Sequence, residues 1–267
     1  MLPDEELKNN LVPITRTQLN EYLKDLGKEF RKLNGTKTVA EIVLVGGAAI
    51  LARYGFRDTT YDVDAIILAS TAMKEAINHV RDKHGLPHGW LNTDFTRTSS
   101  YSDRLLEVST YYRTFSNILT VRTVAAEYLL AMKLMSGRQY KNDLSDIVGI
   151  LWEHQKNGEP LSGEAVEKAF GILYGENTDM PETSRKLLNT IFDNSDFETH
   201  FQLTRESEIE SKELLLEFEN NNPNALKVDN IAGVIERMKQ KRDITPQKDS
   251  LLAKLEQAKR EAEQNHE

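Results

Sequence analysis

Two short motifs decide the fold of this chain: Val45-Gly46-Gly47 and, after a helix and a turn, Thr60-Tyr61-Asp62-Val63-Asp64. The apolar run Ile42–Val45 predicts a buried strand that leads into the glycine pair. The glycines predict a short helix, which begins directly after that strand and ends near Tyr54-Gly55. A second strand is predicted from Tyr61 to Leu68. The pattern is therefore strand, glycine pair, helix, strand.

The second motif places two carboxylates together. Residues two apart in a strand share a face, so Asp62 and Asp64 are expected to lie side by side, with Cα atoms about 6–7 Å apart. Such a pair is costly without a cation, and Mg²⁺ takes oxygen ligands while keeping coordination positions for phosphate oxygens. At a helix start, Gly46 and Gly47 let backbone N–H groups approach a triphosphate. The alternative is a solvent-facing acidic strand beside an ordinary glycine turn.

The surrounding sequence predicts a small mixed α/β unit. Apolar residues at helical spacing indicate an amphipathic helix over residues 16–33, which ends at Asn34-Gly35. A further helix is predicted over residues 71–84. Short extended segments are expected near Trp90–Phe95, Leu105–Tyr111 and Asn117–Val121.

From Ala125 onward the pattern becomes helical, with its clearest break at residues 157–160. We therefore predict an α+β protein: a small mixed-sheet core with helices, followed by an all-α C-terminal region. The predicted divisions are residues 1–38, an N-terminal helix that packs on the core; residues 39–156, the core domain; and residues 157–267, a helical region with a basic terminal helix.

Composition limits the classes of function. The 267 residues include no cysteine, which excludes disulfides, thiolate metal sites and cysteine nucleophiles. No apolar run is long enough for a membrane span and the N-terminus lacks the pattern of a signal peptide, so a soluble, cytoplasmic protein is expected. The formal charge is −8, yet residues 237–260 carry eight cations and three anions. This basic tail is interpreted as a patch for a polyanion or as a solvated helix face.

A second group of charged residues follows the mixed unit. Lys133 lies inside the apolar helix that begins near Ala125, and Asp143 and Asp146 are one turn apart at the start of the next helix. An unpaired buried ammonium is expensive, so Lys133 must be paired or functional. The purely structural alternative is a Lys133–Asp143 ion pair with Asp143 as an N-cap.

The Gly-Gly and Asp-x-Asp motifs resemble those of the nucleotidyltransferase superfamily typified by DNA polymerase β. The segment Glu127–Ile147 is similar to the Lys, Arg, Asp-x-x-Asp segment of the bacterial AbiEii and MenT toxins and of related uncharacterised domains. The resemblance implies transfer of a nucleoside monophosphate from an NTP to an acceptor hydroxyl, with Mg²⁺ or Mn²⁺ as cofactor and release of pyrophosphate. It assigns metal binding to Asp62 and Asp64, nucleotide binding to Gly46, Gly47, Thr60 and Arg57, and catalysis to Asp62, Asp64, Lys133 and Asp143, with Asp146 as the alternative to Asp143.

Polymerase-like members of the superfamily use a third carboxylate on a neighbouring strand, for which Asp94 and Glu107 are candidates. The toxin resemblance implies RNA as acceptor, especially the tRNA 3′ end, with Lys239, Lys241 and Arg242 as candidate contacts. It also implies an antitoxin partner and a role in toxin–antitoxin or phage-defence systems.

Three alternatives remain open at the level of sequence: AMPylation of a partner protein, transfer to a small hydroxylated antibiotic, and an inactive nucleotide sensor or scaffold. Trp90 and Tyr111-Tyr112 could stack a base, although core packing is favoured. A metal site among His79, His84 and His88 is not expected, because Gly85 and Pro87 interrupt the helix that would align them.

Overall fold

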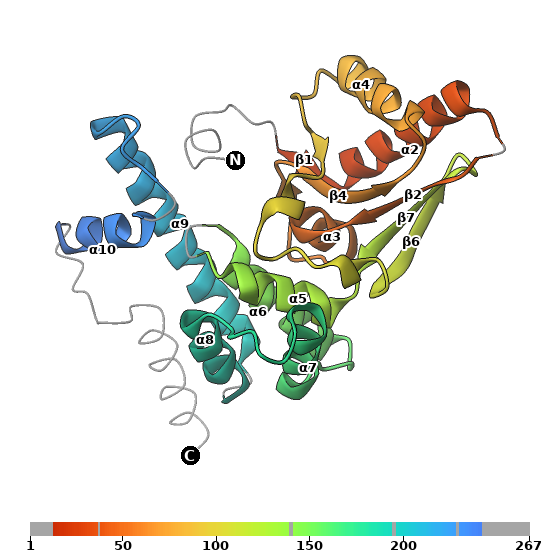
Figure 1. The fold of residues 1–267 in the computed structure, drawn as a ribbon. Helices are drawn as coiled ribbons and strands as arrows, with labels where there is room; N and C mark the ends of the chain where they lie inside the picture. The colour runs from red at the N-terminus through yellow and green to blue at the C-terminus, as the bar shows by residue number, and fades with distance from the viewer. Residues whose placement is uncertain (1–12, 37, 139–140, 194–195, 228–229, 242–267) are drawn as a thin grey trace. The chain divides into compact units, whose positions relative to one another are not determined.

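The computed structural model describes residues 13–36, 38–138, 141–193, 196–227 and 230–241 (Figure 1). Packing divides the chain into two units. Among the described residues, the sheet unit comprises residues 13–132 and 168–178, and the helical unit comprises the rest. The basic terminal helix predicted from the sequence, beyond residue 241, lies outside the described residues.

Among the described residues, five strands of the sheet unit form one sheet in the order β5-β4-β2-β7-β6. The central strand β2 is antiparallel to β4 and parallel to β7. Strand β5 is parallel to β4, and β6 is antiparallel to β7. The mixed sheet confirms the predicted α+β class. The strands are β2 (Ala40–Leu44), β4 (Val63–Leu68), β5 (Leu91–Asn92), β6 (Ser109–Phe115) and β7 (Leu119–Val124).

Complete helices of the sheet unit, within the described residues, are α2 (Arg16–Asn34), α3 (Gly46–Arg53) and α4 (Ala72–His84). Helix α2 begins with a capping box in which Thr15 and Gln18 satisfy each other's backbone N–H groups. Its apolar stripe is buried, as the helical spacing predicts, except at its last member, Leu33, which is 37% exposed. Helix α2 lies beside α4 (Figure 1). The buried stripe consists of Leu19, Leu23, Leu26 and Phe30.

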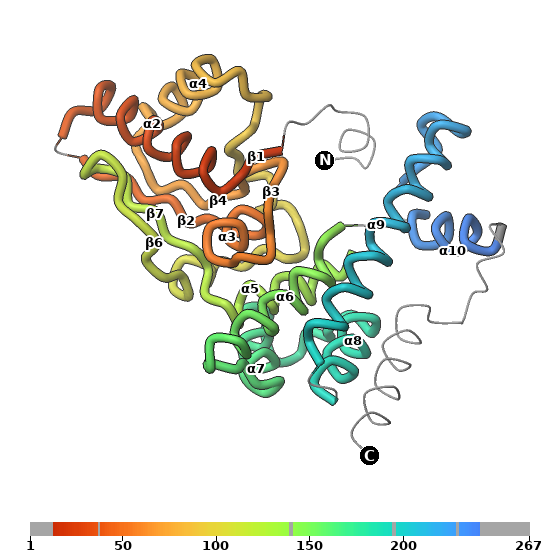
Figure 2. Tube along the Cα trace, turned by 180° about the vertical axis from the view of Figure 1, so that it is seen from behind, coloured from red at the N-terminus to blue at the C-terminus, as the bar shows by residue number. Residues whose placement is uncertain are grey.

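A two-stranded ribbon reaches the region of the Asp-x-Asp motif. Strand β1 (Ile14–Thr15) pairs antiparallel with β3 (Thr59–Thr60), and Figure 2 shows the two side by side. The strand predicted over Tyr61–Leu68 therefore starts at Val63 instead. The chain changes its pairing partner here, from β1 to β2, and residues 61 and 62 connect the two ladders.

Two other predicted extended segments are partly helical. After β5, the side chain of Asn92 accepts the backbone N–H of Asp94 at 2.8 Å and turns the chain into a 3₁₀ helix, Asp94–Arg97. A second 3₁₀ helix, Asp103–Leu105, precedes β6, so that strand begins four residues later than predicted. Local side-chain bonds to the backbone compete with strand formation at both places.

The other described helices lie in the helical unit, except that residues 126–132 of α5 and 168–174 of α7 belong to the sheet unit. Nine consecutive residues of α6, Asp143–Leu151, are buried, and α6 packs along α9. A separate apolar cluster joins α9 to α10 through Leu214, Leu215, Ile231, Val234, Ile235 and Met238. None of the described helices is both long and apolar enough to cross a membrane. The helices are α5 (Ala126–Ser136), α6 (Asp143–Lys156), α7 (Gly163–Tyr174), α8 (Glu182–Asp193), α9 (Phe197–Asn221) and α10 (Ile231–Lys241).

Candidate functional site

The glycine pair forms the first turn of α3, where strand β2 ends. Gly46 has a φ of +53°, a left-handed conformation that glycine adopts without a steric penalty. A Cβ atom on Gly46 would lie 3.9 Å from Oδ2 of Asp64. Val45 provides no side-chain acceptor for this turn, and its own N–H donates to the carbonyl oxygen of Asp64 at 3.0 Å. The Asp64 carboxylate therefore lies next to the positive end of α3.

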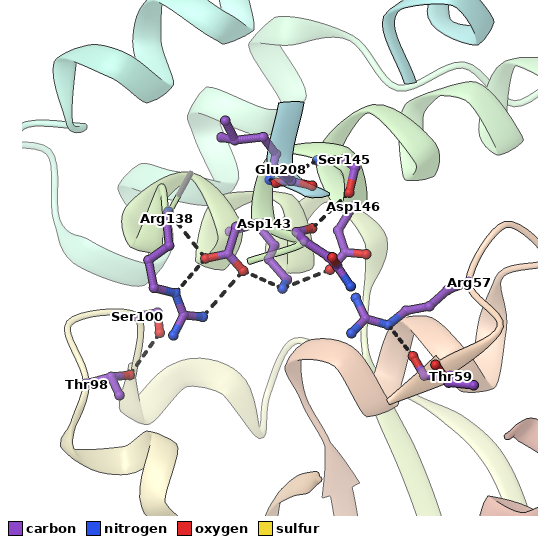
Figure 3. Close-up of polar contacts among 12 residues, drawn as sticks. Arg57, Thr59, Thr98, Ser100, Arg138, Asp143, Ser145, Asp146 and Glu208 are labelled. Atoms are coloured by element: carbon purple, nitrogen blue, oxygen red, sulfur yellow. Dashed lines mark hydrogen bonds and ion pairs between the residues drawn. The ribbon is translucent and has the colours of Figure 1, made fainter. Parts of the chain in front are cut away.

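Gly47 is glycine for a different reason. A Cβ atom at this position would lie 2.8 Å from Nη2 of Arg57 and 2.9 Å from Oγ1 of Thr60. The guanidinium of Arg57 also donates from Nε to the carbonyl oxygen of Thr59 at 3.1 Å (Figure 3). Four of the residues expected from sequence to bind nucleotide are thus close together: Gly46, Gly47, Arg57 and Thr60.

The two aspartates of the Asp-x-Asp motif differ in their local structure. Asp64 lies in β4, whereas Asp62 immediately precedes it. Val63 and Ala65 are fully buried, and the alternating Asp62 and Asp64 are half-buried, as expected for the opposite face. The buried hydroxyl of Thr60 donates to the carbonyl oxygen of Asp62 at 3.1 Å and so fixes the approach to β4.

The candidates for a third acid lie in different places. Asp94 is exposed and follows β5, the strand that pairs directly with β4. Glu107 is exposed in the turn before β6, and β2 and β7 lie between β6 and β4 in the sheet. The residue that faces Asp64 in the β4–β5 register is Asn92, which the sequence did not single out.

The helical unit holds the second predicted group. Lys133, near the end of α5, donates to Oδ1 of Asp143 at 2.6 Å and lies 2.9 Å from Oδ2 of Asp146. Arg138 donates from Nε to Oδ2 of Asp143 at 2.8 Å (Figure 3). The ion pair of the structural alternative is therefore present. Asp143 is the first residue of α6, and Asn142 takes the N-cap position.

The charged groups of this cluster are closely paired, and most of them are buried. Asp143 has 0% exposure, and Lys133 has 8%. Burial alone would raise the pKa of the Asp143 carboxyl, but the charges and hydrogen bonds of Lys133 and Arg138 hold it well below its usual value. Asp143 is therefore ionised over the whole neutral range.

A third carboxyl group reaches the same turn from α9. Oε1 of Glu208 accepts the backbone N–H groups of Leu144 and Ser145, at 2.8 and 3.3 Å (Figure 3). Glu208 was not predicted from the sequence, because nothing in its local pattern sets it apart from the other acids of α9. Arg138 carried a usable signal, since it lies inside the Lys, Arg, Asp-x-x-Asp segment.

The remaining predicted residues are less informative. The side chain of Lys239 is 12% exposed and lies 3.6 Å from Glu210. The side chain of Lys241 and all of Arg242 lie outside the described residues. Trp90 is a core residue, with 1% exposure and an edge contact to the ring of Tyr22.

Tyr111 and Tyr112, the other aromatic candidates for base stacking, lie on the edge strand β6. Tyr111 is 59% exposed, and Tyr112 donates its hydroxyl to Oδ1 of Asn20 at 3.0 Å.

One group of potential metal ligands was not expected. Side chains of Glu21, Asp25 and His84 lie close enough together to share an ion. Asp25 is already ion-paired with Lys28 at 3.1 Å and Lys83 at 2.6 Å. These two cations neutralise the carboxylate, so the group is better explained as a link between α2 and α4.

Comparison with protein families gives one result that bears on this geometry. Residues 21–155 match the model of a family described as a nucleotidyltransferase of unknown function (DUF6036). That segment contains the glycine pair, Asp62, Asp64 and the Lys133 cluster. Comparison with curated proteins and with solved structures found no match.

Proposed function

Because the chain belongs to this family of nucleotidyltransferases of unknown function, we propose that it transfers a nucleoside monophosphate from an NTP to an acceptor hydroxyl and releases pyrophosphate. The observation that carries the proposal is the convergence at the first turn of α3. The carboxylate of Asp64 lies beside the backbone of Gly46, and the guanidinium of Arg57 lies beside the backbone of Gly47.

The first turn of α3 suits the phosphates of the NTP. A helix N-terminus offers backbone N–H groups and a positive partial charge to an anion. The guanidinium of Arg57 lies against Gly47 and adds a full positive charge with several donors. We assign phosphate binding to Gly46, Gly47 and Arg57. We propose that Thr60 positions Asp62 through the hydrogen bond that its hydroxyl donates.

Asp62 and Asp64 fit a divalent cation, because both provide hard oxygen ligands from half-buried positions and the carboxylate of Asp64 lies beside the phosphate-binding turn. When bound, Mg²⁺ or Mn²⁺ would supply charge neutralisation for the triphosphate and the leaving pyrophosphate. In the proposed reaction the acceptor oxygen forms a bond to the α-phosphorus, and the bond from that phosphorus to the pyrophosphate oxygen breaks. We assign the proton of the acceptor hydroxyl to the Asp62–Asp64 pair.

Lys133 is proposed to stabilise negative charge that develops on the phosphates. Two buried carboxylates orient its ammonium. The complete burial of Asp143 and its lowered pKa favour a positioning role for this aspartate over acceptance of a proton. Asp143 and Asp146 would then act through Lys133.

Labelling with each α-³²P-NTP, in the presence of Mg²⁺ and candidate acceptors, tests the transfer. The Asp62→Ala, Asp64→Ala double variant should lose activity by roughly three orders of magnitude or more. Asp82→Ala, at an exposed acid of α4, serves as the matched control and should retain full activity. Transfer by the double variant at the wild-type rate would exclude the proposed site.

For the acceptor, we propose an RNA hydroxyl, with the tRNA 3′ end as the first candidate and a toxin with a cognate antitoxin as the biological setting. The support is the basic tail of the sequence, which beyond Lys239 carries further cations that include Lys241 and Arg242. Because Lys239 is ion-paired with Glu210, the later cations are the expected contacts.

The same labelling experiment separates the acceptors when total tRNA and a cell lysate are both supplied. Label on RNA, together with association that weakens as salt rises, supports the proposal. Label on a protein band would instead assign AMPylation. Nucleotide binding without any transfer would assign a sensor or scaffold.

A further inference from the structure

Glu208 is a buried acid with an unusual environment. It lies in α9, far beyond the segment that matches the family, and it is 3% exposed. Oε1 accepts the N–H groups of Leu144 and Ser145, two of the backbone donors that the first turn of α6 leaves without helical partners. Oε2 is also buried and has no hydrogen-bond partner among the residues that the structure describes.

These contacts favour the neutral form of Glu208. An ionised carboxylate with one buried, unpartnered oxygen is costly, whereas a neutral acid is much less so. Burial raises the pKa of Glu208 well above its usual value, and the negative charges of Asp146 and Asp143 raise it further, against the opposing hydrogen bonds from α6. A neutral Glu208 leaves Asp143 and Asp146 balanced against Lys133 and Arg138, without a third negative charge.

The same contacts determine the geometry of the cluster. Leu144 and Ser145, whose N–H groups Glu208 holds, lie between Asp143 and Asp146 in the sequence. Both flanking carboxylates contact the ammonium of Lys133. Glu208 thus holds the first turn of α6 in place. The orientation of this turn determines whether Asp143 and Asp146 can both contact Lys133.

We propose that Glu208 is a positioning residue for Lys133. It acts from α9 through the first turn of α6, and its neutral acid caps that turn without competing for the lysine charge. The inference rests on the catalytic role proposed for Lys133. It extends the functional machinery beyond the family-matching segment, into the C-terminal helical region.

The experiment compares Glu208→Gln with Glu208→Leu in the full chain. Glutamine keeps a neutral side chain whose oxygen can accept both N–H groups, so transfer should stay within about twofold of wild type. Leucine removes the acceptor. The Leu144 and Ser145 amides should then exchange with solvent faster, Lys133 should react faster with an amine-specific reagent, and kcat should fall by about tenfold or more at an unchanged KM.

Glu213→Leu is the matched control, because Glu213 is an exposed acid of the same helix. It should leave amide exchange, lysine reactivity and kcat unchanged. If Glu208→Leu does not fold, Glu208→Asp takes its place, since the shorter acid cannot reach both N–H groups and should also release them.

The outcomes separate the two proposals. If the wild-type chain transfers no nucleotide, the proposed function fails, while amide exchange and Lys133 reactivity still test the positioning. Unchanged exchange and lysine reactivity in the leucine or aspartate variant overturn the role of Glu208. If the glutamine variant is as impaired as the leucine variant, the role of Glu208 is overturned as well, because a neutral acceptor at this position would then not preserve activity.

Discussion

The two glycines at the start of α3 meet different requirements. Gly46 needs a left-handed backbone, whereas Gly47 must leave room for Arg57 and Thr60. Substitution at Gly47 therefore tests the phosphate-binding turn through packing alone. An alanine at Gly47 adds one methyl group, so its effect depends on the few atoms that this methyl would contact.

We predict that Gly47→Ala displaces Arg57 and weakens NTP binding by about tenfold, because its Cβ would lie 2.8 Å from Nη2. Isothermal titration with NTP and Mg²⁺ measures the effect. Gly171→Ala is the matched control: Gly171 lies in α7, and an added Cβ would meet no atom within 4 Å. Equal affinities for the two variants would contradict the packing described at Gly47.

At the scale of elements, the N-terminal segment supports α3. Arg16, the first residue of α2, donates from Nε to the carbonyl oxygen of Leu51 at 2.7 Å and from Nη2 to that of Tyr54. These bonds satisfy carbonyl groups at the C-terminal end of α3, next to a cation. The β1–β3 pairing meanwhile holds Thr60 in place.

Arg16→Ala should lower the free energy of unfolding by about 1–3 kcal/mol, since two carbonyl groups lose a charged donor. Urea denaturation measures the change. Arg97→Ala, at an exposed arginine of the 3₁₀ helix, should change stability by less than about 0.5 kcal/mol. An equal effect of the two substitutions would show that Arg16 contributes nothing specific to α3.

The packing of α2 against α4 depends on an ionised acid. Asp25 contacts Lys28, Lys83 and His84, at 3.1, 2.6 and 2.9 Å. Burial alone would raise the pKa of Asp25, but the hydrogen bonds from Lys83, His84 and Lys28 hold it well below its usual value. The folded state therefore favours the charged form.

The pKa of Asp25 is lower in the folded state than in the unfolded state, where it is about 4. Ionised Asp25 therefore stabilises the fold above about pH 4, and this stabilisation is lost as the pH falls below that value. Asp25→Asn should thus destabilise the protein by about 2 kcal/mol at pH 7, with a smaller difference at pH 3. Urea unfolding at both pH values tests this, with Asp82→Asn as the exposed control. A difference that grows toward pH 3 would contradict the assigned ionisation.

At the scale of the whole molecule, the family-matching segment is not self-sufficient. It ends at residue 155, whereas the buried residues of α6 pack along α9, which begins at Phe197. Strand β1 and Arg16 precede the segment. We predict that residues 21–155 alone form an aggregated or molten species, because α6 would expose its apolar surface. Circular dichroism and size-exclusion chromatography against the full chain decide this, and a cooperative thermal transition of the segment would contradict it.

Sequence patterns predicted the elements whose information is local. The stripe from Leu19 to Phe30 repeats at helical spacing, and the Gly46-Gly47 pair marks the turn from strand to helix. Both predictions are confirmed. The predicted start of the strand at Tyr61 was wrong, because the chain changes its pairing partner there from β1 to β2. That change depends on a strand more than forty residues earlier in the chain.

Sequence patterns were sufficient to predict the fold class and the placement of Asp64 in a strand that follows the helix begun by the glycine pair. They also indicated that Lys133 needs a partner, since a buried ammonium must be neutralised. The contact of Arg57 with Gly47, and the bonds from Glu208 to the turn between Asp143 and Asp146, became visible only in the folded chain. These contacts depend on how separate segments pack against one another, and such packing leaves no local periodicity in the sequence.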